Sequence, residues 1–73
     1  MTAKQMIKKI EAAWISTANV RIVGSREIEV KSERKAFRIF ELLPNTGGYR
    51  CGYGWWVIRE GYRSNPLIAA NID

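Results

Sequence analysis

Arginine and aromatic side chains alternate along residues 49–63, and this segment has the residue types that recognise nucleic acids. Guanidinium groups pair with phosphates and base edges, and aromatic rings stack on unpaired bases. The segment therefore predicts a nucleic-acid-binding surface on a strand. Its candidate binding residues are Arg50, Tyr53, Trp55, Arg59, Tyr62 and Arg63.

The same rings have two other uses, which stay open at this point. Trp55 and Trp56 are neighbours, so on a strand they point to opposite faces and at least one of them belongs to the core. Tryptophan, tyrosine and arginine also dominate the hot spots of protein interfaces. The alternative function is a small protein-binding inhibitor or regulator of phage type, which docks on an acidic surface of a host enzyme such as a polymerase or nuclease.

A second basic patch precedes this segment. On a helix over residues 33–43, Arg34 and Arg38 are one turn apart and project together, a spacing that suits a backbone phosphate. The alternative is a solvated helix face on which Glu41 supports Arg38. The patch comprises Lys31, Arg34, Lys35 and Arg38.

Few residues are available for catalysis or metal binding. The chain has no histidine, which excludes Ser-His and Cys-His pairs and imidazole ligands. Its one cysteine, Cys51, cannot build a structural zinc site. The sequence contains no Walker A motif and no dinucleotide fingerprint. We therefore expect a binding protein that is not an enzyme and uses no cofactor and no metal.

Length and charge limit the class of protein further. The 73 residues carry a net charge of +5, which attracts phosphates and acidic protein surfaces. We expect a single domain over residues 1–73, because so short a chain has no room for a second core. Its apolar runs are too short for a membrane span or a signal peptide. With a single cysteine that cannot form an internal disulfide, these features predict a cytoplasmic protein.

Two helices are predicted to support the candidate surfaces. Thr2 and Gln5 fit a capping box, and apolar residues then recur at helical spacing over residues 3–17. Ser32 is a suitable N-cap for a second helix over 33–43, which Pro44 and Asn45 would end. A long strand is the alternative for this second segment.

The strands are expected to form one antiparallel sheet. Val20 and Ile22 share a face with Ile28 and Val30 only if an odd number of residues separates the two strands. We therefore expect a loop of three or five residues around Gly24. The aromatic segment adds one or two further strands, and a short terminal helix could begin at Pro66.

The predicted fold is α+β, with an antiparallel sheet of three or four strands and both helices packed on one of its faces. An exposed edge strand in so small a sheet also makes a homodimer an open alternative. The expected core residues are Ile7, Ile10, Trp14, Ile22, Ile28, Val30, Phe37, Phe40, Leu43, Val57 and Ile58.

Overall fold

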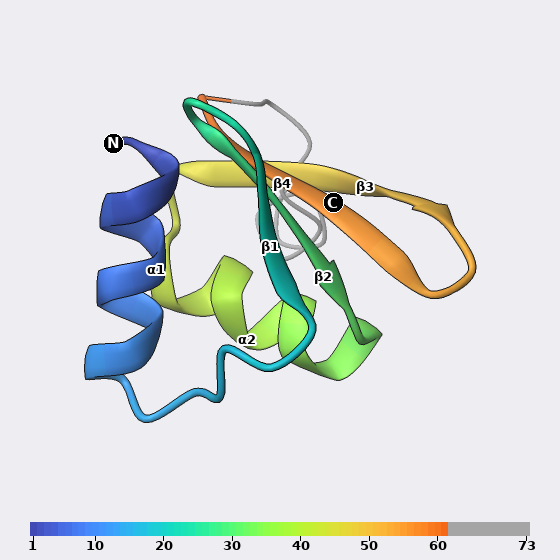
Figure 1. The fold of residues 1–73 in the computed structure, drawn as a ribbon, viewed down its shortest axis with the longest axis horizontal. Helices are drawn as coiled ribbons and strands as arrows, with labels where there is room; N and C mark the ends of the chain where they lie inside the picture. Colours follow the sequence, from blue (N-terminus) through green and yellow to red (C-terminus); the bar gives the residue numbers. More distant parts are fainter. Residues whose placement is uncertain (62–73) are drawn as a thin grey trace, which may run out of the picture.

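A computed structural model describes residues 1–61 and shows two helices on one face of a four-stranded antiparallel sheet (Figure 1), which confirms the α+β prediction. The sheet order is β1-β2-β4-β3, so β1 and β3 are the edge strands. The terminal helix predicted at Pro66 lies outside the described residues. In chain order the elements are α1 (Ala3–Ala12), β1 (Val20–Gly24), β2 (Glu27–Lys31), α2 (Glu33–Leu42), β3 (Thr46–Gly52) and β4 (Trp55–Glu60).

The first helix begins as the sequence predicts and ends five residues early. At its start, the Gln5 N–H donates to Thr2 Oγ1 over 3.2 Å and the Thr2 N–H donates to Gln5 Oε1 over 2.7 Å, which completes the capping box. The last helical residue is Ala12, because Trp14 adopts a left-handed backbone with φ of 60°. The chain then leaves the helix axis and crosses in front of α2 on its way to β1 (Figure 1).

This helix end reverses the predicted roles of Trp14 and Ile15. Trp14, expected in the core, is 95% exposed, whereas Ile15 is buried. The Trp14 N–H donates to Glu11 O and the Ile15 N–H donates to Ile10 O, the two hydrogen bonds of a Schellman motif. Such a motif brings the residue after the left-handed position back against the helix, so Ile15 packs beside Ile10 and the Trp14 side chain points into solvent.

The second predicted helix is confirmed as α2, and its alternative as a strand is wrong. Ser32 Oγ accepts a hydrogen bond from the Lys35 N–H over 3.1 Å, which caps the helix. The face that α2 turns to the sheet is buried at Ala36, Ile39 and Phe40. Its opposite face is exposed and carries arginine and glutamate side chains, so α2 presents charge to solvent.

The β1–β2 hairpin has the predicted register but a shorter loop. Val20 pairs with Val30 and Ile22 with Ile28, which places all four on one face. The odd spacing comes from a β-bulge between Ile22 and Gly24 and not from a longer loop. Ile22, expected in the core, is 50% exposed because β1 is an edge strand.

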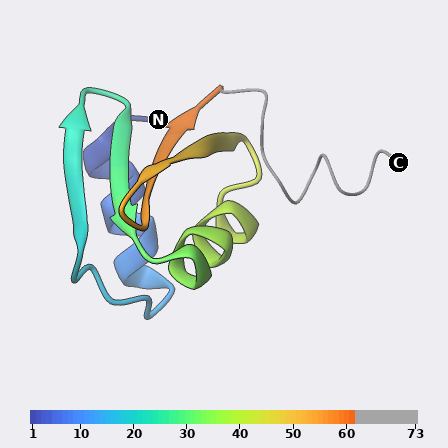
Figure 2. The ribbon, with the colours of Figure 1, turned by 90° about the vertical axis from the view of Figure 1, so that its right-hand side faces the viewer.

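The core lies between the helices and one face of the sheet, as the two views show together (Figures 1 and 2). Trp56 is buried there, with its ring centroid 5.3 Å from that of Phe37 and 6.1 Å from that of Phe40.

Gly48 lies against β4, where an added Cβ would be 1.8 Å from Val57 O. Only glycine allows the two strands to approach this closely. Of the other predicted core residues, Val57 is buried on the opposite face of the sheet.

Candidate functional site

The structure distributes the predicted strand residues over several surfaces instead of one. Trp55 and Arg59 lie on the face of the sheet that the helices leave uncovered, the open face. Arg50 pairs with Trp56, so its side chain lies on the other face of the sheet, at the β3 edge. The predicted residues Tyr62 and Arg63 lie outside the described residues.

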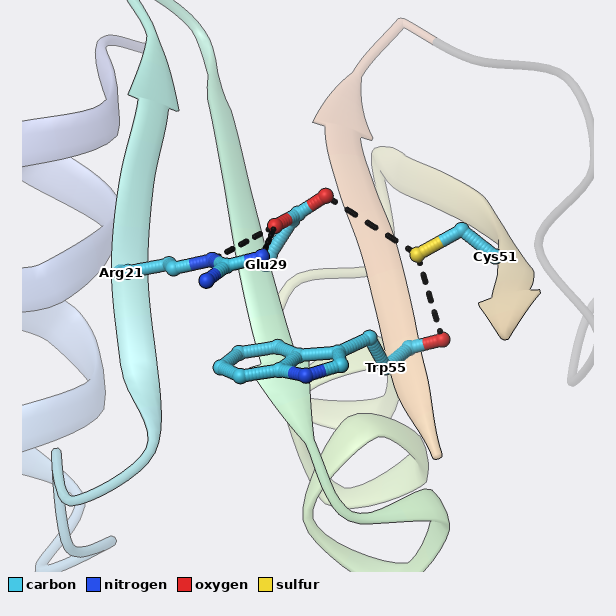
Figure 3. Close-up of polar contacts among 4 residues, drawn as sticks. All are labelled: Arg21, Glu29, Cys51 and Trp55. Atoms are coloured by element: carbon cyan, nitrogen blue, oxygen red, sulfur yellow. Dashed lines mark hydrogen bonds and ion pairs between the residues drawn. The ribbon is translucent and has the colours of Figure 1, made fainter. Parts of the chain in front are cut away.

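On the open face, Arg21 and Trp55 already interact with each other (Figure 3). The Arg21 guanidinium carbon lies 4.0 Å from the Trp55 ring centroid, a cation–π contact. The same guanidinium pairs with Glu29, with Nε 2.6 Å and Nη2 2.5 Å from Oε1. Cys51 Sγ completes the group at 3.4 Å from the Trp55 carbonyl oxygen. A phosphate or base at this place would have to displace partners that the fold itself supplies.

Tyr53 lies at the tip of the β3–β4 hairpin and is 97% exposed. Both Tyr53 and Gly54 have positive φ, 51° and 81°, as a type I′ turn requires. The hairpin tip and the end of α1 lie at opposite sides of the molecule (Figure 1). The tip is therefore distant from the end of α1, although the loop after α1 returns to the sheet at Asn19, whose carbonyl oxygen accepts from the N–H of Lys31, the partner of Trp55.

The second predicted patch lines a cleft between the loop after α1 and the helix α2. The cleft has a volume of about 330 Å³. Three of the four predicted basic residues line it, whereas Lys31 pairs with Trp55 on the open face. Among the described residues, no acidic side chain lines the cleft. The lining, which defines the Trp14 cleft, is Trp14, Ile15, Ser16, Ser32, Arg34, Lys35 and Arg38.

The loop that carries Trp14 is fastened at both of its ends. Its start is held by the Schellman hydrogen bonds to α1. Farther along, Lys35 Nζ donates to Ala18 O over 2.6 Å, and the Ala18 N–H donates to Ser16 Oγ over 3.1 Å. Lys35 thus ties the loop to α2. The backbone that carries Trp14 is therefore held in place on both sides, so little backbone entropy is lost when a ligand binds beside it.

Arg34 and Arg38 supply the accessible positive charge of the cleft. They are exposed and stand one turn apart on α2. Within residues 1–61, neither guanidinium group makes a hydrogen bond or an ion pair, unlike that of Arg21. Glu41 lines an adjoining groove with Arg38 but forms no ion pair with it. The two guanidinium groups therefore remain available for an anionic ligand.

Sequence reasoning predicted the cations of this cleft but missed its aromatic ring. The polar residues Ser16, Thr17 and Asn19 do indicate a loop after the first helix. The apolar pattern does not say which of Trp14 and Ile15 turns inward, because both are large and hydrophobic. The helix stripe favoured Trp14 for the core, whereas the structure buries Ile15.

The described part of the chain offers no group of three or more His, Cys, Asp or Glu side chains that could hold a metal ion. None of its helices is long and apolar enough to cross a membrane. No known protein family matches the chain, and searches of curated proteins and solved structures found no significant similarity.

Proposed function

We propose that this protein is a non-catalytic nucleic-acid-binding domain that binds through the Trp14 cleft. One observation carries the proposal: an indole that is 95% exposed stands beside three basic side chains in a cleft that no carboxylate of residues 1–61 lines. Each component has a counterpart in a nucleotide. The ring can stack on a base, and the basic groups can pair with phosphates.

The charge of the whole chain supports an anionic ligand. A net charge of +5 on 73 residues draws phosphates toward the surface from a distance. Arg34 and Arg38 then offer guanidinium groups that no carboxylate within residues 1–61 occupies. Arginine binds phosphate through two parallel hydrogen bonds, so two arginines one turn apart can hold one stretch of backbone in place.

Nucleic-acid affinity and its dependence on salt test this proposal. Fluorescence anisotropy of labelled oligonucleotides is measured between 50 and 200 mM salt, concentrations over which phosphate contacts lose most of their strength. We expect the double variant Arg34→Ala/Arg38→Ala to lower affinity at low salt by roughly tenfold or more. Its slope of log affinity against log salt should also be shallower, by about 1.4 to 1.8 for two lost phosphate contacts.

A charge-matched variant separates a site from general attraction. Lys4 and Lys8 are exposed on α1 and do not line the Trp14 cleft, so Lys4→Ala/Lys8→Ala removes the same charge elsewhere. We expect this variant to bind almost as well as the unaltered protein. Equal losses for the two double variants would contradict a specific cleft. No binding at 50 mM salt would reject nucleic acid and leave an acidic protein surface as the ligand to test.

A further inference from the structure

We infer that the Trp14 cleft selects unpaired nucleotides over a duplex, with Trp14 as the platform on which one base stacks. This inference rests on the proposed function and specifies its substrate class. Inside a duplex the faces of the bases are covered by their neighbours, so an aromatic side chain reaches a base face only where the strand is unpaired.

The position of Trp14 supports stacking. Its backbone stands at the left-handed position of a Schellman motif, which glycine usually occupies. At 95% exposure the ring adds almost nothing to the core. A bulky residue with a left-handed backbone is unusual, and here burial of the side chain does not explain it. We therefore look for its cause in function. An indole with an open face beside cations is suited to a base and its phosphates.

The charges on α2 argue against docking in the groove of a duplex. Glu33 and Glu41 are exposed near the two ends of the helix, and Arg34 and Arg38 lie between them in sequence. If α2 lay along a groove, its carboxylates would approach the phosphates of the two strands. A single strand that enters the cleft beside Trp14 meets Arg34, Lys35 and Arg38, and no acidic side chain among residues 1–61 lines that cleft.

The test compares one short oligonucleotide, as DNA and as RNA, in its single-stranded form and as a blunt duplex. Anisotropy is measured at a fixed low salt concentration for the unaltered protein, Trp14→Phe and Trp14→Leu. We expect the single strand to bind at least tenfold more tightly than the duplex. Trp14→Leu should weaken single-strand binding by roughly 5- to 150-fold, the range found for loss of one stacked base, and should change duplex binding little.

The phenylalanine variant distinguishes stacking from simple hydrophobic contact. Because Trp14→Phe keeps an aromatic face, it should retain most of the single-strand affinity that Trp14→Leu loses. Equal affinity for single strand and duplex, or equal losses for both in Trp14→Leu, would overturn the selectivity and leave the proposed function in place. If neither the single strand nor the duplex binds, the proposed function itself fails.

Discussion

The open face of the sheet and the Trp14 cleft contain the same residue types in different states. On the open face, the Arg21 guanidinium is held between Glu29 and the Trp55 ring, so its binding capacity is used within the fold. In the cleft, Arg34 has no such partner among residues 1–61, and Trp14 is almost fully exposed. Arginine and tryptophan therefore indicate a binding surface only where neighbouring side chains leave them available.

The two regions also differ in what they contribute to stability. The sheet buries Trp56 between the rings of α2, and its polar open face is crosslinked by Arg21. The cleft holds a tryptophan in a left-handed conformation, which costs an L-residue about 1–2 kcal/mol. We interpret the sheet as the scaffold and the cleft as the surface that gives up some stability for recognition.

The largest effect is expected from Gly48→Ala, which tests the sheet as scaffold. The new Cβ would meet Val57 O at 1.8 Å, so β3 and β4 would have to separate. We expect the free energy of unfolding to fall by about 3 kcal/mol or more, measured by urea denaturation. Gly24→Ala is the control, because its Cβ would stand 3.5 Å from Glu27 Cβ, an ordinary contact. Similar stability for the two variants would refute the close strand packing.

A smaller effect is expected from Tyr53→Asn, which tests whether the hairpin tip takes part in binding. Asparagine tolerates the left-handed conformation better than tyrosine, and Asn-Gly is the preferred type I′ turn. We expect stability to rise by about 0.5–1 kcal/mol. Affinity for nucleic acid should stay within twofold, because Tyr53 does not line the Trp14 cleft. A tenfold loss would place the tip in the interface and remove the distinction between the two regions.

Local sequence signals predicted most of the fold. The cap residues Thr2 and Ser32 mark the true starts of both helices, since capping depends on neighbours within one turn. The requirement that Ile22 and Ile28 share a face predicted the register, although a bulge and not a longer loop provides it. The spacing of apolar residues also predicted most of the core, because apolar residues recur on the face of each helix or strand that is covered.

The candidate site was only half predictable, because its ring depends on tertiary packing. Arg34 and Arg38 follow from helical spacing alone. The exposure of Trp14 follows from where α1 stops, and that depends on Ile15 fitting the core. On the strands, the pairing of Arg50 with Trp56 puts Arg50 on the opposite face from Trp55, and no local pattern shows that Trp55 is covered by Arg21 from another strand.

Trp14→Gly, measured for both stability and binding, tests most directly whether this residue serves recognition at the expense of the fold. Glycine is the preferred residue at this left-handed helix end, so we expect the free energy of unfolding to stay unchanged or to rise by about 0.5–1 kcal/mol. Single-strand affinity should fall at least tenfold in the same preparation. A variant that is less stable by more than about 1 kcal/mol, or one that binds as well as the unaltered protein, would contradict that assignment.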